Sequence, residues 1–409
     1  MDVYEQSLEA HKKNRGKIEV HSRMRLDSKE DLSLAYTPGV ARPCEEIARD
    51  PACAWDLTWK GRTVAVVTDG SAVLGLGNIG PMASLPVMEG KAALFKEFAG
   101  IDAVPVVLDT QDSAEVVRIV QAIAPTYGGI NLEDISAPRC FQIEDELQDI
   151  GIPVMHDDQH GTAIVLLAAM KNACRVIGRP LEKCKVVISG AGAAGSAIAK
   201  LLGHEDGKTS SSSVESLLLC DSRGVLFPGR AGNNPSKEEV ARLTNPGGRQ
   251  GTLKEAMAGA NVFIGVSRAN LLDVGDIRRM DADPIIFAMA NPTPEIDPKE
   301  ARQGGAAIVG TGRSDFPNQV NNVLAFPGLF RGALEARAVR FNKVMFQAAV
   351  DALVDCVRDP GPLRILPPAF DRSVAVKVAR QVAEAARRSG ACVGPACAPA
   401  ETSPSGAPA

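Results

Sequence analysis

Apolar residues occur along this chain in short continuous runs, separated by longer stretches in which apolar positions recur every three or four residues. The short runs are rich in Val, Ile and Leu and predict buried strands. They lie at residues 62–68, 103–108, 126–132, 152–155, 185–188, 217–220, 261–264, 284–289 and 307–309. Helices are expected at residues 83–98, 113–124, 161–173, 196–202, 236–243 and 253–258. Strands that alternate with helices are typical of an α/β fold with parallel sheets.

A chain of 409 residues is expected to form two or three domains, and we divide it into two with a C-terminal tail. Residues 1–160 are expected to form an N-terminal α/β domain. Residues 161–389 are expected to form a Rossmann-like, doubly wound parallel-sheet domain that ends in helices. The segment 390–409, rich in Pro, Ala and Ser, is expected to be a disordered tail. The serine-rich segment 204–216 is expected to be a mobile surface loop.

The strand at 185–188 runs directly into glycines in G-x-G-x-x-G register and then into a helix. That order predicts a dinucleotide site, because the glycines allow a tight turn, close approach of a pyrophosphate and close packing of helix on strand. The next strand ends in an aspartate placed to accept a hydrogen bond from a ribose hydroxyl. The expected cofactor residues are Gly190, Gly192, Ala193, Ala194, Gly195, Ser196 and Asp221.

A second G-x-G-x-x-G, formed by Gly75, Gly77 and Gly80, competes for the same role. Several loop residues separate it from its strand, and prolines follow it. We therefore interpret it as a loop that makes close backbone contacts near a site.

Lys91 lies on the apolar stripe of the helix at 83–98, whereas Lys96 does not. Its amine is either snorkelling towards water or desolvated. Desolvation lowers the pKa of a lysine, which would make Lys91 a usable general base. The pattern alone favours neither alternative.

Two successive strands end in paired carboxylates, Glu133 with Asp134 and Asp157 with Asp158. Each pair separately could cap a helix. The carboxyl ends of parallel strands share one edge of a sheet, so the four groups could also converge around a cation. Oxygen ligands without sulfur suit Mg²⁺ or Mn²⁺. A zinc site at His156 and His160 is less favoured than ordinary polar contacts, since no third soft ligand is near in sequence.

Other polar residues are ambiguous on their own. Tyr36 precedes a turn formed by Pro38 and Gly39, where a tyrosine is more often a packed aromatic than an acid. Asn291 and Asn321 follow strands, where asparagines usually fix turns but could bind a small carboxylate.

The composition is that of an ordinary soluble protein, with 45% hydrophobic and 23% charged residues. A net charge of -4 without a basic cluster argues against nucleic-acid binding. Nine scattered cysteines without a C-x-x-C pair suit a reducing compartment. The early charges argue against a signal peptide, and no apolar run reaches the roughly 18 residues of a membrane span. We therefore expect a cytoplasmic protein with no membrane partner.

Several motifs taken together resemble those of malic enzymes of the compact bacterial type, over residues 30 to 340. They are Tyr36-Thr-Pro-Gly-Val, Glu89-Gly-Lys, Glu133-Asp-Ile, His156-Asp-Asp-Gln-His-Gly-Thr-Ala, the Gly190–Gly195 turn, Ala290-Asn-Pro-Thr and Asn321-Asn-Val-Leu-Ala-Phe-Pro-Gly. The resemblance implies a malic-type catalytic and metal domain at 1–160 and an NAD(P)-binding domain at 161–389. It also implies oxidative decarboxylation of (S)-malate to pyruvate and CO₂, with NAD or NADP, in a homodimer.

The resemblance also assigns roles to individual residues. It makes Glu133, Asp134 and Asp158 the ligands of Mg²⁺ or Mn²⁺. Lys91 would take the hydroxyl proton, Asp157 would assist that base, and Tyr36 would protonate the enol. It implies that malate binds Asn291, Asn321 and Asn322, and that Asn291 also contacts the cofactor.

Two departures leave questions open. The arginine that larger animal-type enzymes place on the malate carboxylate is absent, since Ala72 and Val73 stand in that region. We expect backbone N–H groups of the loop at 75–80 to replace it. Asp221 slightly favours NAD, whereas Arg223 could accept a 2′-phosphate. The alternatives are a non-oxidative malate or oxaloacetate decarboxylase, another dehydrogenase, and a catalytically silent dinucleotide-binding protein.

Overall fold

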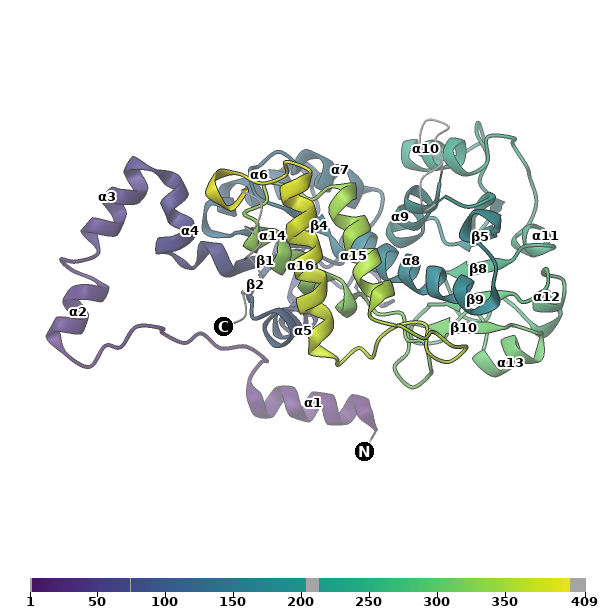
Figure 1. The fold of residues 1–409 in the computed structure, drawn as a ribbon, viewed down its shortest axis with the longest axis horizontal. Coiled ribbons are helices and arrows are strands. Elements are labelled where there is room, and N and C mark those ends of the chain that lie inside the picture. Colours follow the sequence, from purple (N-terminus) through teal and green to yellow (C-terminus); the bar gives the residue numbers. More distant parts are fainter. Residues whose placement is uncertain (1, 74, 204–212, 398–409) are drawn as a thin grey trace, which may run out of the picture.

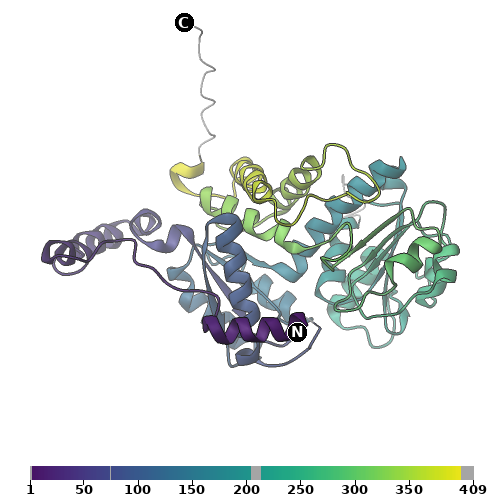
Figure 2. The same ribbon diagram turned by 90° about the horizontal axis from the view of Figure 1, so that it is seen from below.

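The structure, a computed structural model, describes residues 2–73, 75–203 and 213–397 (Figure 1). Most of the expected serine-rich loop at 204–216 and the last twelve residues of the expected tail, 398–409, lie outside the described residues. Two α/β units lie side by side, each built around its own sheet, as the alternating pattern predicts (Figure 2).

The first unit is a four-stranded parallel sheet with the order β2-β1-β3-β4. Its strands are β1 (Thr63–Thr68), β2 (Asp102–Val107), β3 (Gly129–Leu132) and β4 (Val154–His156). Its helices are α5 (Pro81–Ala99), α6 (Ser113–Ile123) and α7 (Arg139–Glu146). β1, β3 and β4 are buried along their whole length, which explains their continuous apolar runs.

The second unit is a six-stranded sheet with the order β10-β9-β8-β5-β6-β7. It comprises β5 (Lys185–Ser189), β6 (Ser216–Asp221), β7 (Gly224–Val225), β8 (Val262–Gly265), β9 (Ile285–Ala288) and β10 (Ile308–Thr311). All pairs are parallel except the short β6–β7 hairpin. Its helices are α9 (Ala193–Leu202), α10 (Pro235–Thr244), α11 (Leu253–Met257), α12 (Val274–Arg278) and α13 (Pro298–Gln303). The expected Rossmann-like fold is confirmed.

The long helix α8 (Asp157–Ile177) leads from the first sheet to the second. Three C-terminal helices, α14 (Phe326–Glu335), α15 (Lys343–Asp355) and α16 (Arg372–Arg388), pack against α5 and α8 (Figure 1). Phe95 of α5 contacts the rings of Phe326 and Phe330, with centroids 4.8 and 5.4 Å away. The helices that the sequence pattern grouped with the cofactor domain therefore also close the core of the first unit.

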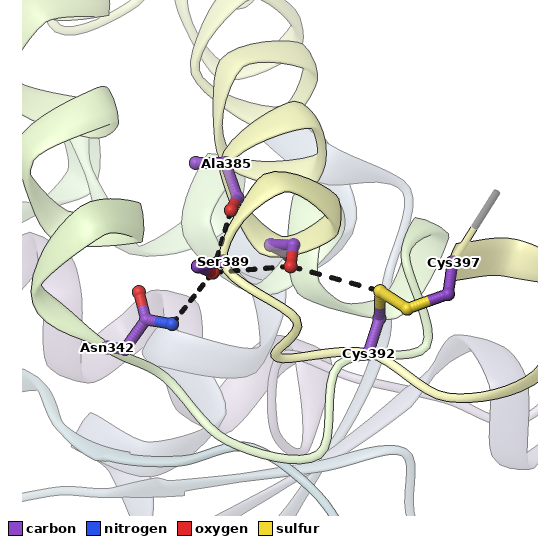
Figure 3. The surroundings of a disulfide bond; sticks show 6 residues. Asn342, Ala385, Ser389, Cys392 and Cys397 are labelled. Carbon is purple, nitrogen blue, oxygen red and sulfur yellow. Dashed lines mark hydrogen bonds between the residues drawn. A yellow bond between two sulfur atoms is a disulfide. The ribbon is translucent and has the colours of Figure 1, made fainter. Parts of the chain in front are cut away.

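The chain remains ordered beyond α16, where we expected the tail to begin at residue 390. Val339 donates its backbone N–H to Ala391, Cys392 forms a β-bridge with Ala338, and η6 (Gly394–Cys397) follows. Cys392 and Cys397 are joined by a disulfide beside the end of α16 (Figure 3). The expected start of the tail is therefore wrong for residues 391–397, because this segment is tied to the preceding loop.

Residues 18–53 form an extended N-terminal arm that projects away from the first unit (Figures 1 and 2). It follows α1 (Val3–Asn14), which lies near α5, and it carries α2 (Lys29–Ala35) and α3 (Ala41–Arg49) before α4 (Ala54–Leu57) returns to the sheet. None of α1, α2 and α3 buries a residue. The arm is thus helical in part and makes little contact with its own chain.

Short 3-10 helices complete the described chain: η1 (Pro51–Cys53), η2 (Trp59–Arg62), η3 (Ala124–Thr126), η4 (Leu181–Lys183) and η5 (Asn322–Leu324). Among the described residues, no helix combines the length and apolar character that crossing a membrane requires.

Candidate active site

Carboxylates gather at the carboxyl edge of the first sheet. Glu133 and Asp134 follow β3, and Asp157 and Asp158 follow β4, its parallel neighbour. One oxygen from each of Glu133, Asp134 and Asp158 lies within 4.8 Å of the others. Asp134 adopts a left-handed backbone (φ 52°) and donates its N–H to Asp158 Oδ2 at 2.9 Å. Three carboxylates so close together repel one another, so an all-oxygen set of this kind fits Mg²⁺ or Mn²⁺.

The Lys91 side chain is 7% exposed and reaches this cluster from α5. Its Nζ lies 2.8 Å from Glu133 Oε1 and 2.7 Å from Asp157 Oδ2. It also lies 4.2 Å from the centre of the Phe326 ring. Of the two alternatives that the stripe left open, the structure adopts the desolvated one.

The expected direction of the Lys91 pKa is wrong. Burial alone would lower the pKa, but the carboxylates of Asp157 and Glu133 outweigh it and hold the pKa above the ordinary lysine value. Burial raises the pKa of Asp157 to about 6, against the opposing effect of Lys91. Burial likewise raises the pKa of Glu133 and of Asp158. The site thus holds an ammonium group next to carboxylates that accept protons more readily than usual.

Asp157 is held in place by a glycine and an amide that sequence reasoning did not assign to it. A Cβ at Gly161, one turn along α8, would lie only 1.9 Å from Asp157 Oδ1. Asn322 donates its Nδ2 to Asp157 Oδ2 at 2.6 Å. The structure therefore places Asn322, an expected malate ligand, against the Asp157 carboxylate that contacts Lys91.

The two histidines beside these aspartates do not converge on one metal. His160 Nε2 lies 2.9 Å from Glu144 Oε1, and its ring stacks on Phe346. This agrees with the preferred interpretation of ordinary polar contacts. His156 is fully buried, and neither ring nitrogen has a hydrogen-bond partner among the described residues.

The glycine turn after β5 has the geometry that close packing requires. A Cβ at Gly195 would lie 1.7 Å from the Gly190 carbonyl oxygen, and Gly190 itself has φ 119°. A Cβ at Gly192 would meet nothing within 4 Å. No side chain caps the start of α9, which begins with Ala193, Ala194, Gly195 and Ser196. Its first N–H groups can therefore meet a phosphate.

Asp221 ends β6 as predicted, but its carboxylate is already engaged. Arg230 binds it with two nitrogens at 3.0 and 2.5 Å, Lys237 Nζ lies at 2.8 Å, and the Arg223 backbone N–H donates at 2.9 Å. The Arg223 side chain donates to the Ala231 carbonyl. Asp221 therefore does not stand free to accept from a ribose.

The asparagine loops follow the carboxyl edge of the second sheet. Asn291 is exposed after β9, and a Cβ at Gly75 would lie 2.9 Å from its carbonyl oxygen. The loop at 75–80 therefore makes a close backbone contact, as its preferred interpretation predicts. Asn321 Oδ1 accepts from the Val323 N–H and caps η5, which is the turn-fixing role.

The hypothesis that N–H groups of the loop at 75–80 hold a malate carboxylate does not extend to three of its six N–H groups. Leu76 donates its N–H to Val73, and Ile79 and Gly80 both donate to Gly70. Those three amides are thus used within the loop.

Tyr36 is not brought to this site within one chain. It forms the C-terminal cap of α2 on the N-terminal arm and is 66% exposed. Figures 1 and 2 show α2 well away from α5 and the first sheet. The turn at Pro38 was predicted, but not that the arm would point away from the domain.

Comparisons with known proteins identify the family of the chain. The family models "Malic enzyme, N-terminal domain" and "Malic enzyme, NAD binding domain" match residues 13–115 and 159–387. The "Bifunctional malic/malolactic enzyme" of Bacillus subtilis is 53% identical over 95% of this chain and 94% of its own. The "NADP-dependent malic enzyme" of Halomonas elongata is 49% identical over 87% and 83%.

A crystal structure of the NAD-dependent malic enzyme from Thermotoga maritima superposes with a TM-score of 0.88. That protein is 47% identical, and the match covers 94% of this chain and 99% of the other. Two matching family domains and relatives this similar over nearly the whole chain show that it belongs to the malic enzyme family.

Proposed function

We propose that this enzyme oxidatively decarboxylates (S)-malate to pyruvate and CO₂, reduces NAD⁺ or NADP⁺, and requires Mg²⁺ or Mn²⁺. The observation that carries the proposal is the buried Lys91 ammonium, which lies between Glu133 and Asp157 at the edge of a three-carboxylate cluster. Lys91 contacts two buried carboxylates, and the carboxylates of Asp134 and Asp158 follow them directly in the chain. A lysine with a purely structural role would not need so many acidic groups nearby.

Glu133, Asp134 and Asp158 would hold the cation. A bound Mg²⁺ or Mn²⁺ would act as a Lewis acid that stabilises negative charge on the substrate oxygen during decarboxylation. The same three side chains position the substrate beside Lys91, because Glu133 contacts both the cluster and Nζ.

Lys91 accepts the malate hydroxyl proton as hydride leaves for the nicotinamide. The ammonium must first lose a proton, and Asp157 is suited to receive it, because Oδ2 lies 2.7 Å away and burial raises its pKa to about 6. Asn322 and Gly161 keep that carboxylate directed at Lys91. The lysine thus acts as the base, and Asp157 assists it.

Tyr36 supplies the proton to the enol from a second copy of the chain, in a homodimer. The supporting observations are that α2 and α3 bury no residue and that the arm exposes Val20, Leu34 and Tyr36. The other two tyrosines are not substitutes, since Tyr127 is buried in the core of the first unit and Tyr4 is exposed on α1. A partner that covers the arm would explain both its exposed apolar residues and the distance of Tyr36 from its own Lys91.

The choice of dinucleotide stays open between NAD and NADP. The initial preference for NAD rested on a free Asp221, yet Arg230 and Lys237 already occupy that carboxylate. Asp221 with Arg223, Arg230 and Lys237 carries a net positive charge, which does not disfavour a 2′-phosphate. Asn291, at the edge of the second sheet, is proposed to contact the cofactor and malate.

A second candidate function is non-oxidative decarboxylation of malate. It is suggested by the name of the Bacillus relative, which includes a malolactic activity. In that reaction malate would be converted to lactate and CO₂ without net reduction of the dinucleotide. Net formation of NADH or NADPH distinguishes the two reactions.

The test is a steady-state assay with malate, NAD⁺ or NADP⁺, and Mn²⁺, which follows reduced dinucleotide, pyruvate and lactate together. Equal amounts of reduced dinucleotide and pyruvate support the proposal, provided that chelation of the metal abolishes them. Lys91→Ala should abolish hydride transfer, whereas Lys96→Ala on the exposed side of α5 should not. Lactate without net reduction, or turnover in the Lys91→Ala variant, would overturn the proposal.

A further inference from the structure

One amide stands in an otherwise apolar face of the first sheet. Asn131, in β3, is 0% exposed. Its register neighbours are Val66 of β1 and Met155 of β4, both in the hydrophobic core between the sheet and its helices. Burying an amide there is unfavourable unless its hydrogen bonds are satisfied. The fold alone would be served as well by a residue such as Leu.

Among the described residues, the Asn131 side chain makes one hydrogen bond, and its partner belongs to the candidate active site. Its Nδ2 donates to Glu133 Oε2 at 2.8 Å, while its Oδ1 has no donor among the described residues. The side chain is therefore half satisfied, and the half that is satisfied serves Glu133. An amide retained for the stability of the strand would be expected to use both of its ends.

Glu133 is consequently held at both oxygens. Oε1 accepts from Lys91 at 2.8 Å, and Oε2 accepts from Asn131. With one oxygen fixed on each side, the carboxylate cannot rotate freely about its last bond. The same carboxylate is one of the three whose oxygens lie within 4.8 Å of one another.

We propose that Asn131 is a positioning residue for Glu133, which fixes the rotation of a carboxylate that must serve Lys91 and a divalent cation at once. The inference rests on the proposed function in one respect, the binding of the cation by Glu133, Asp134 and Asp158. Groups that orient metal ligands from behind commonly change metal affinity by about 10- to 100-fold when they are removed.

The test compares Asn131→Leu with Asn172→Leu in the full-length chain. Asn172 is equally buried, but it lies in α8 about 20 Å along the helix from Asp158, and it donates to the Ile365 carbonyl. The readouts are the Kd for Mn²⁺ alone, from electron paramagnetic resonance without substrate, and the melting temperature. We expect Asn131→Leu to raise the Kd about 10-fold or more, and Asn172→Leu to leave it unchanged.

The outcomes separate this inference from the proposed function. A wild-type chain that does not bind Mn²⁺ overturns both. Wild-type binding with an Asn131→Leu Kd within twofold of normal overturns only the role of Asn131. If Asn131→Leu does not fold, Asn131→Ala provides the same measurement without added bulk.

A double-mutant cycle decides whether Asn131 acts through Glu133. In a Glu133→Gln background, the hydrogen bond from Asn131 no longer positions a charged ligand, so Asn131→Leu should cause no further loss of Mn²⁺ affinity. Additive losses would mean that Asn131 acts independently of Glu133, and the inference would fail.

Discussion

The Asp157 carboxylate is positioned by groups from three parts of the chain. Lys91 lies 66 residues earlier, Asn322 165 residues later, and Gly161 one helical turn away. Gly161→Ala would place a Cβ 1.9 Å from Oδ1 and force the carboxylate aside. Because a displacement of about 1 Å can cost about 100-fold in rate, we expect a loss of that order in kcat. Steady-state kinetics and the melting temperature together measure it.

Gly90→Ala is the matched control, since Gly90 also lies within a helix that carries a catalytic residue. Its Cβ would meet only the flexible end of Lys17, at 4.0 Å. Replacing a helical glycine by alanine under those conditions stabilises by about 0.5–1 kcal/mol. Equal kinetics for Gly161→Ala and Gly90→Ala would contradict the positioning role of Gly161.

The ion pairs of Asp221 should make the free energy of unfolding depend on pH in the acid range. Burial alone would raise its pKa, but Arg230 and Lys237 outweigh burial and hold the pKa well below the ordinary value. The unfolded chain therefore binds this proton at about pH 4 while the folded chain does not. The stabilisation is fully present above about pH 4 and is lost as the pH falls further.

Asp221→Asn should remove that part of the acid dependence. It should also lower the free energy of unfolding at pH 7 by about 1–3 kcal/mol, because Arg230 loses its charged partner. Urea unfolding between pH 3 and 7 measures both effects. Stability curves that coincide for the variant and the wild type from pH 3 to 7 would show that the pair contributes nothing.

At the residue scale, the sequence predicts which side chains are buried better than it predicts their ionic partners and pKa values. The apolar stripe of one helix is local, so it could place Lys91 on the buried side of the helix, although it left snorkelling and desolvation as equal alternatives. The direction of the Lys91 pKa could not be anticipated, because Glu133 and Asp157 approach it from other strands. For the same reason Asp221 could be placed at the end of its strand, but its engagement by Arg230 was not visible.

At the scale of elements, the glycine turn and the start of α9 act as one unit, in which two glycines have different tasks. A Cβ at Gly195 collides with the Gly190 carbonyl, whereas a Cβ at Gly192 meets no protein atom within 4 Å. Gly195→Ala should therefore lower both stability and dinucleotide affinity. Gly192→Ala should keep the melting temperature and lose affinity alone, because the added methyl group occupies space that the pyrophosphate needs. Calorimetry with NAD⁺ and NADP⁺ and thermal unfolding check the contrast.

Unchanged affinity in Gly192→Ala would contradict the placement of the pyrophosphate. Two equally destabilised variants would contradict the division of tasks between the glycines.

Strands were more predictable than the packing of helices. Continuous apolar runs located all the long strands, including β2, which was expected to be buried but is only partly buried. The two-residue β7 and the short helices α12 and α13 carry too few residues for a pattern. The apolar stripes of α14 and α16 predict that these helices are buried. They do not specify that both pack on α5 rather than on the second sheet.

At the scale of the whole molecule, the N-terminal arm is the feature that one chain leaves unexplained. Its turn at Pro38 and Gly39 followed from the sequence, but its direction did not, since no local periodicity specifies where an arm without buried residues points. Exposed apolar residues such as Leu26, Leu34 and Tyr36 on an arm without buried positions favour an interface between copies. Gel filtration with light scattering should give a dimer, and deletion of residues 18–53 would not be informative, because it removes Tyr36 as well.

A heterodimer decides whether Tyr36 serves its own chain or its partner's. Tyr36→Phe and Lys91→Ala chains, carrying different purification tags, would be coexpressed and the mixed dimer isolated. If Tyr36 acts across the interface, one site of the mixed dimer unites an intact Lys91 with an intact Tyr36, and pyruvate should form at about half of the wild-type rate per dimer. If Tyr36 acts within its own chain, both sites lack one group, and the mixed dimer should be no more active than the better of its two parent homodimers. The exposed position of Tyr36 on the arm makes us expect the first result.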